Sequence, residues 1–384
     1  MVDQYRRFIL LSSGLLLTAS LIGQPLSFAG SRPKDDRRPQ FRQAEKGYAY
    51  RFPFDHGSHD EFRTEWWYYT GHLETDGGRQ FGYQLTFFRR RMPPDAVKDN
   101  PSRWAIEHLY FAHCALSDHD GRTFRYAEKI SRAGIGKAGA DTGRLRVWID
   151  RWKAETPDHG AVRQRLEAST HTFEVKLDVV PQKPPVVHGL QGVSRKGPAQ
   201  RNASHYYSLT RLATTGSVLI DGEQLHVTGI SWMDHEFGSG ELGEDQTGWD
   251  WFSLQLDNGL DVMLYLMRRR DGSIDSVSSG TLIHRDGRME HLSMSDIDAE
   301  TLDRWQSHAS GASYPSRWRI IIPKTGLDVL ITPRQPNQEL ITKQSTRVTY
   351  WEGAVTIAGL LRGAAVGGAG YVELTGYAEA FAPP

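Results

Sequence analysis

The chain has 384 residues, of which 46 are Lys or Arg and 46 are Asp or Glu, so its formal net charge is zero. Balanced charge makes a nucleic-acid binder or a polybasic membrane binder a poor candidate. Cys114 is the only cysteine, which excludes disulfide frameworks, zinc ribbons and CxxC redox pairs. The 38 glycines and the many aromatic residues (11 Trp, 15 Tyr and 15 Phe) favour turn-rich β structure over helical bundles.

The N-terminus has the pattern of an export signal. Arg6 and Arg7 precede an uncharged, mostly apolar run at 8–23, and small residues suit cleavage after Ala29. The apolar run is shorter than the roughly 20 residues of a spanning helix, although an uncleaved membrane anchor stays an alternative. The arginine pair also resembles a twin-arginine signal, so the general secretory route and the twin-arginine route both stay open. We expect residues 1–29 to be removed and the mature protein to be periplasmic or secreted.

The segment that follows the signal, residues 30–46, is charged and carries prolines, which is typical of a solvated, disordered leader. Beyond it, apolar and polar residues alternate, as in strands that bury one face. The clearest alternating runs are 81–87, 145–150, 173–179 and 260–267. Turn signals such as Asp-Gly stand between these runs and predict hairpins at short intervals. The best candidate for a short helix is 295–306.

An internal repeat divides the chain into two halves. The motif at 67–69, the turn at 76–78 and the FFRR run at 87–90 recur at 249–251, 257–259 and 266–269. The repeat predicts two similar β domains. We place the N-terminal domain at 47–214 and the C-terminal domain at 215–384.

Each half contains a cluster in which carboxylates stand beside aromatic residues. An aromatic wall with few polar groups is the usual composition of a small-molecule site. A carboxyl group among tryptophans would lose solvation, and its raised pKa would let it donate a proton near neutral pH. The same residues are also compatible with a structural role, closing a barrel end and capping turns. The clusters comprise Glu65, Trp66, Trp67 and Tyr69 in the first half, and Trp232, Asp234, His235, Phe237, Trp249, Asp250 and Trp251 in the second.

Other chemical motifs are weak. His56 and His59 with Asp55 have a spacing that a metal ion could use, but no paired ligand motif supports them, so no metal and no other cofactor is predicted. The sequence has neither a GxSxG elbow nor a glycine-rich phosphate loop, which argues against acyl transfer and nucleotide chemistry. Cys114 lies in a strand-like run and is expected to be a buried, small apolar residue.

Six motifs resemble the AttH-like family, which includes the carotenoid 1,2-hydratases (hydroxyneurosporene synthases of the CrtC type). The resemblance implies an all-β fold of two tandem lipocalin-like (calycin) antiparallel β-barrels, and a barrel of that type can hold one apolar ligand. Relatives of these hydratases include a fungal hydratase that acts on a prenylated isoflavonoid, and lipocalin-like cyclases are more distantly similar. The motifs lie at 52–59, 63–71, 206–211, 229–236, 248–252 and 370–377.

The resemblance implies the addition of water to a C=C bond of an apolar, isoprenoid-like substrate. An acid protonates the alkene, aromatic faces stabilise the tertiary cation, and water captures it. We expect Asp250 to be the acid, His235 with Asp234 to orient or deprotonate the water, and Tyr265 to point into the same space. The residues expected to bind the substrate are Trp249, Trp251, Trp232, Phe237, Glu65, Trp66, Trp67 and Tyr69.

Two departures from the hydratases keep other functions open. Phe237 stands where relatives usually carry Trp, and the export signal points away from a membrane-bound pigment pathway. The sequence is therefore as compatible with another prenyl-like or lipid substrate as with a carotenoid. The alternatives are a non-catalytic carrier of a lipid or isoprenoid in the cell envelope and a structural role with an envelope transport partner. The enzyme requires Asp250 and His235 to point into one cavity, whereas a carrier needs only apolar walls.

Overall fold

The computed structural model accounts for most of the chain beyond the predicted signal segment, which lies outside the described residues together with the leader up to residue 40. Residues 41–46, which we assigned to the leader, belong to the fold. Phe41 and Ala44 are buried, and the backbone N–H of Arg42 donates to the Glu61 carbonyl at 3.0 Å. The described residues are 41–93, 106–134, 136–158, 162–240 and 242–381.

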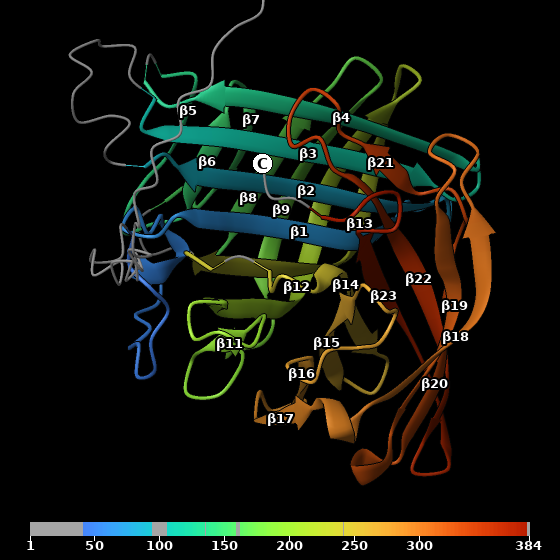
Figure 1. Ribbon diagram of the computed structural model, residues 1–384. Helices are drawn as coiled ribbons and strands as arrows, with labels where there is room; N and C mark the ends of the chain where they lie inside the picture. The colour runs from blue at the N-terminus through green and yellow to red at the C-terminus, as the bar shows by residue number, and fades with distance from the viewer. Residues whose placement is uncertain (1–40, 94–105, 135, 159–161, 241, 382–384) are drawn as a thin grey trace, which may run out of the picture. The chain divides into compact units, whose positions relative to one another are not determined.

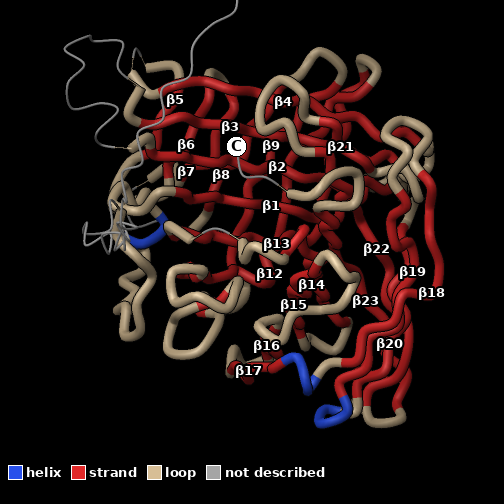
Figure 2. Tube along the Cα trace, in the orientation of Figure 1, coloured by secondary structure: helices blue, strands red, loops and turns tan. Residues whose placement is uncertain are grey.

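The regular structure of the described chain is almost entirely antiparallel strand, joined by turns and loops (Figures 1 and 2). Its only helical elements are three short 3-10 turns, η1 (Phe54–His56), η2 (Met294–Asp296) and η3 (Pro323–Thr325). No helix in this part of the chain has the length and apolar character needed to cross a membrane. The predicted helix at 295–306 is wrong. Its residues form η2 and strand β18 (Asp298–Gln306), because pairing with the neighbouring strand supplies the backbone hydrogen bonds and overrides local propensity.

The first sheet has 13 strands in the order β4-β3-β2-β1-β13-β12-β9-β8-β7-β6-β5, with β10 and β11 paired to β12. One face of this sheet surrounds a core that includes Trp67, Leu85 and Val147, and β4 approaches β5, so the sheet curls into a barrel. The strands are β1 (Thr64–Glu74), β2 (Gln80–Arg91), β3 (His108–Asp118), β4 (Thr123–Arg132), β5 (Ala138–Ala140), β6 (Arg146–Ile149), β7 (Trp152–Glu155), β8 (Gln164–Ser169), β9 (Phe173–Pro181), β10 (Val186–Val187), β11 (Ser194–Arg195), β12 (Ala203–Ile220) and β13 (Glu223–Gly238).

The second sheet has 10 strands in the order β17-β16-β15-β14-β23-β22-β20-β19-β18, with β21 paired to β22. It curves around a separate core that includes Phe252, Trp318 and Val329. Its remaining strands are β14 (Gln246–Leu256), β15 (Asp261–Arg269), β16 (Ser279–Ile283), β17 (Met289–Ser293), β19 (Ser313–Ile322), β20 (Leu327–Pro333), β21 (Glu339–Ile341), β22 (Thr349–Leu361) and β23 (Ala364–Thr375).

The two sheets repeat one strand order. Strands β4-β3-β2-β1-β13-β12 of the first sheet correspond to β17-β16-β15-β14-β23-β22 of the second. The two tryptophan-containing segments lie on β1 and β14, which occupy the same place in this order. The architecture is that of tandem lipocalin-like barrels, and the sequence repeat coincides with the repeated strand order.

The change from one sheet to the other comes later than the domain boundary that we predicted at residue 214. That residue lies inside β12, and the next strand, β13, also belongs to the first sheet. The hairpin of β12 and β13 belongs to the first sheet because β13 pairs with every residue of β1. The chain enters the second sheet between Gly238 and Gln246.

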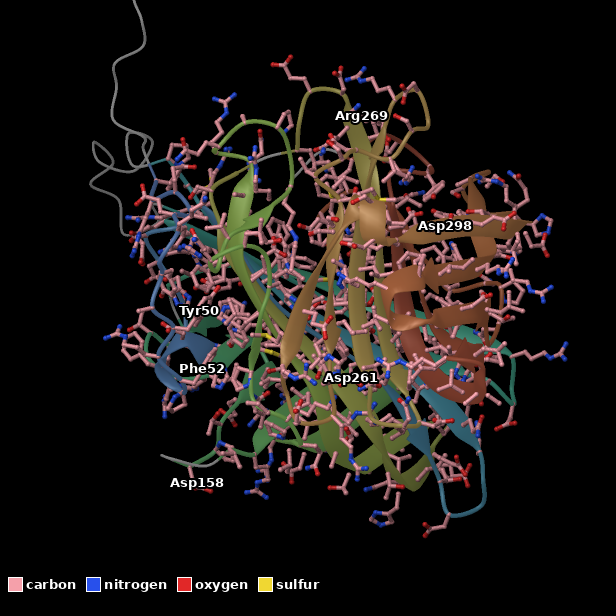
Figure 3. All side chains as sticks on the ribbon, turned by 90° about the horizontal axis from the view of Figure 1, so that it is seen from below. Tyr50, Phe52, Asp158, Asp261, Arg269 and Asp298 are labelled. Atoms are coloured by element: carbon pink, nitrogen blue, oxygen red, sulfur yellow. The ribbon has the colours of Figure 1, made fainter. Side chains whose placement is uncertain are left out.

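The outer faces of the two sheets pack against each other in a layer that we call the seam. It lies between β1, β2, β3, β12 and β13 of the first sheet and β14, β15, β22 and β23 of the second. Tyr206 and Trp232 meet Trp251 and Tyr265 there. At one end Asp261 of β15, labelled in Figure 3, is fully buried and pairs with Lys183 and Arg211 at 2.7 and 2.6 Å. Ion pairs and aromatic contacts therefore hold the two sheets together.

Candidate active site between the two sheets

A cavity of about 220 Å³ lies in the seam, outside both barrels. The resemblance implied a ligand inside a barrel, but each barrel interior holds a packed apolar core and, beside it, a buried ion pair. Strands β1, β2, β3, β12 and β13 form one wall of the cavity, and β14, β15 and β23 contribute to the other. Its aromatic lining includes Trp66, Tyr68, Tyr206, Trp249, Trp251 and Tyr265.

Asp234 faces the cavity from the first sheet. Alternation along β13 directs Asp234 and Glu236 to the seam and His235 to the first barrel. The Asp234 carboxylate accepts hydrogen bonds from the Tyr206 hydroxyl and the Trp232 indole N–H, each at 2.6 Å, and from the Ser208 hydroxyl. Burial raises the pKa of Asp234 to about 7, although these three donors oppose the shift.

Glu373 faces the same cavity from β23 of the second sheet. Its carboxylate accepts a hydrogen bond from the Trp249 indole N–H at 3.2 Å, and it has no ion pair with any described residue. Burial raises the pKa of Glu373 to about 7, and the negative charges of Asp234 and Glu236 add to this effect. The cavity therefore holds two carboxyl groups that can exchange a proton near neutral pH.

Glu352 on β22 is the direct cross-strand neighbour of Glu373 on β23. It is buried, and neither carboxyl oxygen has a well-formed hydrogen bond within the described chain. Burial and then the charge of Glu373 raise the pKa of Glu352 well above its ordinary value, and the Tyr68 hydroxyl opposes this shift. We did not predict Glu352 or Glu373 as site residues. The available signal was a charged residue within an otherwise apolar strand, and Glu373 lies inside the motif at 370–377.

Tyr265 lines the cavity with its ring, but its hydroxyl is not free to act on a ligand. It donates to the Arg195 carbonyl at 3.0 Å and accepts from Ser279 at 2.8 Å. The Lys196 ammonium lies 4.1 Å from the centre of the same ring and 3.3 Å from Glu236. Tyr265 thus positions the loop that carries Lys196, rather than acting as the catalytic group that we predicted.

Asp250 does not face the cavity. Alternation along β14 turns Trp249 and Trp251 to the seam and Asp250 to the core of the second barrel. There its carboxylate accepts hydrogen bonds from Arg268 at 2.8 Å and from the Tyr377 hydroxyl at 3.0 Å. Burial raises the pKa of Asp250, and the Arg268 charge opposes that shift. Asp250 is therefore half of a buried ion pair, and its predicted role as the acid is wrong on this geometry.

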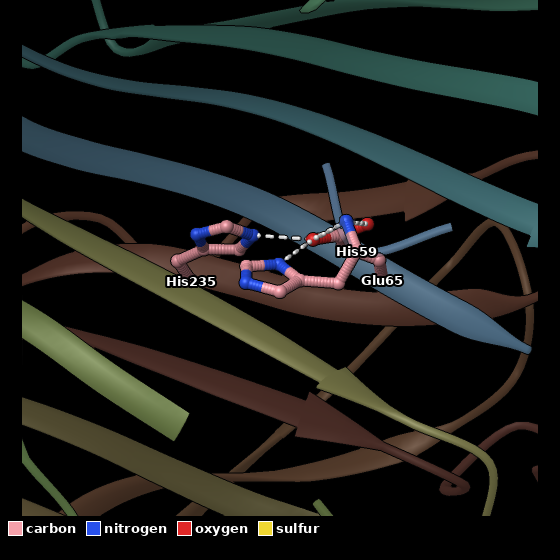
Figure 4. A group of neighbouring side chains, drawn as sticks. All are labelled: His59, Glu65 and His235. Atoms are coloured by element: carbon pink, nitrogen blue, oxygen red, sulfur yellow. Dashed lines mark hydrogen bonds and ion pairs between the residues drawn. The ribbon is translucent and has the colours of Figure 1, made fainter. Parts of the chain in front are cut away.

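The first barrel also contains a buried ion pair. The Glu65 carboxylate on β1 lies 3.0 Å from the Arg89 guanidinium on β2. His235 belongs to this group and not to the cavity. Dashed lines in Figure 4 join one Glu65 oxygen to the rings of His59 and His235, each at 2.8 Å. Asp250 and His235 consequently point into two different barrels, and neither lines the seam cavity. The hydratase mechanism that required both of them in one cavity therefore fails, and a catalytic role has to rest on other residues.

His59, Glu65 and His235 are close enough together to be tested as a metal site. The second ring nitrogen of His59 lies 3.2 Å from the Asp55 carboxylate, so both nitrogens face acids. Burial alone would lower the pKa of His59, but the hydrogen bonds to Asp55 and Glu65 raise it to about 9. An imidazolium has no free lone pair, and Arg89 already neutralises Glu65. In the described chain the cluster is a buried ion network in which Glu65 joins Arg89 and both histidines.

The remaining predicted binding residues divide between the two faces of their strands. Trp67 and Tyr69 lie in the first barrel core, and Phe237 stacks on the His59 ring at 3.6 Å between ring centres. Trp232 packs in the seam and acts through its hydrogen bond to Asp234. Of the predicted residues, those that line the cavity are Asp234, Tyr265, Trp66, Trp249 and Trp251.

Comparisons with known proteins agree with this architecture. A family model described as AttH-like matches residues 43–377. The structure of an AttH protein from Nitrosomonas europaea is 36% identical in sequence, with a TM-score of 0.79, and the match covers 88% of this chain and 99% of that chain. No curated protein has a significantly similar sequence.

Two more distant structures show the same fold. Kievitone hydratase from Nectria haematococca is 15% identical with a TM-score of 0.67, over 88% of this chain and 96% of that chain. CghA in complex with Sch210972 is 13% identical with a TM-score of 0.51, over 83% of this chain and 89% of that chain. With a family match over nearly all of the described residues, the chain belongs to the AttH-like family.

Proposed function

We propose that this protein is a cofactor-independent hydratase that adds water to a C=C bond of an apolar, isoprenoid-like substrate in the seam cavity. The observation that carries the proposal is the placement of Asp234 and Glu373. The two carboxyl groups face one cavity from opposite sheets, among tryptophan and tyrosine rings. Two carboxyl groups of near-neutral pKa are what acid–base chemistry at neutral pH requires.

Glu373 is the better general acid of the two. Among the described residues only Trp249 donates a hydrogen bond to it, and two neighbouring carboxylates disfavour its ionised form. A neutral carboxyl group held in an apolar cavity can transfer its proton to one carbon of an alkene. The other carbon then becomes a tertiary cation, and the faces of Trp249 and Trp251 stabilise its charge. A positioned general acid contributes about 10²- to 10⁴-fold to a rate.

Asp234 is the better general base, because three donors favour its carboxylate form. It accepts a proton from the water molecule that attacks the cation. The proton lost by Glu373 ends on carbon, the water oxygen forms the new C–O bond, and the proton of that water ends on Asp234. Return of a proton from Asp234 to Glu373, directly or through solvent, resets the site.

A non-catalytic carrier of an apolar ligand would use the same aromatic wall. A carrier gains nothing, however, from buried carboxyl groups whose raised pKa values cost stability at neutral pH. The carboxyl groups therefore favour the enzyme over the carrier. Because the sequence pattern of residues 1–29 is that of an export signal, we also propose that the protein works in the periplasm or outside the cell.

The test is a turnover assay in water enriched in the heavy oxygen isotope. Purified protein is incubated with acyclic carotenoids, linear terpenes and prenylated phenols, the last chosen because kievitone hydratase shares the fold. Mass spectrometry should detect one molecule of heavy water added to a member of this panel, and no addition with Glu373→Gln. Binding of panel members without any product would overturn the hydratase and establish the carrier.

A further inference from the structure

A continuous chain of hydrogen bonds leads from the cavity wall to the surface beside β4. The Tyr350 hydroxyl lies 2.8 Å from Nδ1 of His113, and Nε2 of His113 lies 2.9 Å from the Ser345 hydroxyl. The Ser345 hydroxyl in turn lies 2.5 Å from the Glu128 carboxylate. Tyr350 and His113 both line the cavity and are buried, whereas Glu128 is only half-buried.

The chemistry of the four groups fixes the direction of every bond. The Glu128 carboxylate can only accept, so Ser345 donates to it, and the Ser345 oxygen then accepts from the Nε2–H of His113. Burial lowers the pKa of His113 to about 3, so the ring is neutral and carries one proton. Its Nδ1 is therefore free to accept the hydroxyl proton of Tyr350. All three donors point from the cavity toward the surface.

The contacts of Glu128 go beyond what is needed to anchor the turn that precedes β22. Two backbone N–H groups, of Gln344 and Ser345, donate to the same carboxylate at 3.1 and 2.7 Å. These bonds already fix the turn on β4. The Ser345 hydroxyl and His113 add a connection that the anchor does not require. At the inner end, Gln84 donates to the Tyr350 oxygen at 3.1 Å and holds that hydroxyl in place.

We propose that Tyr350, His113, Ser345 and Glu128 form a proton path between the seam cavity and solvent. Tyr350 passes its proton to Nδ1 of His113 while it accepts one from the cavity. His113 releases its Nε2 proton to Ser345, Ser345 releases its own to Glu128, and Glu128 releases it to water. One proton enters and one leaves, and the reverse sequence recharges an acid in the cavity. The path rests on the proposed acid–base function and deepens it, because it gives the cavity a second route for protons besides its opening to solvent.

The test follows the exchange of the His113 Nε2–H with solvent by NMR of the full chain, labelled with ¹⁵N at histidine and tryptophan. The internal reference is the indole N–H of Trp152, which is buried in the first barrel and bonded to the Ser169 carbonyl. Ser345→Ala and Glu128→Gln should each slow His113 exchange by about tenfold, the loss expected from removing one hydrogen-bonded link. Trp152 exchange should not change.

Two matched variants complete the experiment. Ser345→Thr keeps the hydroxyl and should restore exchange. Ser117→Ala removes another buried seam hydroxyl, which donates to the Gln338 side chain, and should have no effect. The ¹⁵N shifts of His113 should report an unprotonated Nδ1. Unchanged exchange in Ser345→Ala, parallel changes at Trp152, or a protonated Nδ1 would overturn the path. Because no substrate is used, failure of the path and failure of the hydratase are separate results.

Discussion

Glu352 and Glu373 lie directly opposite each other on β22 and β23, with Glu352 buried in the seam and Glu373 half-buried at the cavity wall. The equivalent strands of the first sheet, β12 and β13, place Ser208 opposite Asp234. Ser208 donates a hydrogen bond to its neighbour, whereas Glu352 presents a second acid. This difference between the cross-strand neighbours of the two acids favours the ionised form of Asp234 and the protonated form of Glu373.

Replacing Glu352 should stabilise the protein. A buried carboxyl group without a well-formed hydrogen bond costs free energy, so Glu352→Met should raise the free energy of unfolding by about 1–3 kcal/mol at neutral pH. Since the pKa of Glu352 is raised in the folded state, the unfolded state loses its proton first and gains stability above pH 4.5. The increase in the free energy of unfolding caused by Glu352→Met should therefore be smaller below pH 4.5 than at neutral pH. Urea unfolding of both proteins at one pH on each side of 4.5 measures this difference.

The control for this variant is Glu300→Met, at an exposed position on β18. It should change the free energy of unfolding by no more than about 0.5 kcal/mol. Destabilisation of the protein by Glu352→Met would show that Glu352 has a partner that compensates its burial, and would contradict the description of Glu352 as an uncompensated acid.

Asp250→Asn should damage stability and leave the cavity intact. The substitution leaves the Arg268 charge without its partner beside the second barrel core, which should cost about 3 kcal/mol. Binding of an apolar fluorescent probe in the seam should stay within a few-fold of wild type. Thermal unfolding and probe titration of one preparation measure both quantities. Normal stability combined with lost binding would place Asp250 in the cavity, against the present geometry.

His59 should stabilise the fold as a cation. Its folded-state pKa of about 9 lies above the unfolded value of 6.5, so its contribution is complete below pH 6.5 and is lost as the pH rises through 9. Unfolding measurements should show a loss of roughly 2–3 kcal/mol over this range that is absent in His59→Gln. Zn²⁺ should leave the unfolding temperature of the wild type unchanged. A clear rise with Zn²⁺ would mean that His59 is neutral and binds metal.

The rate of water addition should depend on pH as a narrow bell centred near neutrality. Asp234 acts as a carboxylate, so activity falls as the pH drops below its pKa of about 7. Glu373 acts as an acid, so activity falls as the pH rises above its pKa, also about 7. Initial rates across this range measure the profile. A rate that increases steadily with pH would exclude Glu373 as a proton donor.

Local sequence patterns were sufficient to predict the all-β fold and the repeat. Alternation identified the strands, and the tryptophan motifs marked β1 and β14 as equivalent. The helix prediction at 295–306 failed because an edge strand paired with its neighbour decides the backbone there. The boundary at residue 214 failed because closing the first sheet requires β13, and no local signal marks that pairing.

The site was harder to predict because residues adjacent in sequence point to opposite faces of a strand. Asp234 and His235 are neighbours, yet one lines the cavity and the other lies in a barrel. Which face meets the second sheet is decided by sheet packing, which the sequence pattern does not contain. Glu352 and Glu373 meet only through the register of β22 with β23, so the sequence pattern did not show that the two acids are neighbours.

The most direct test of the central claim compares two carboxyl substitutions at the substrate found by the isotope assay. Glu373→Gln should reduce the initial rate of water addition by at least about 100-fold, with ligand affinity within a few-fold of wild type. Asp250→Asn, assayed below its unfolding temperature, should retain most of the wild-type rate. If Asp250→Asn abolishes water addition while Glu373→Gln proceeds at the wild-type rate, the seam cavity is not the site of the reaction.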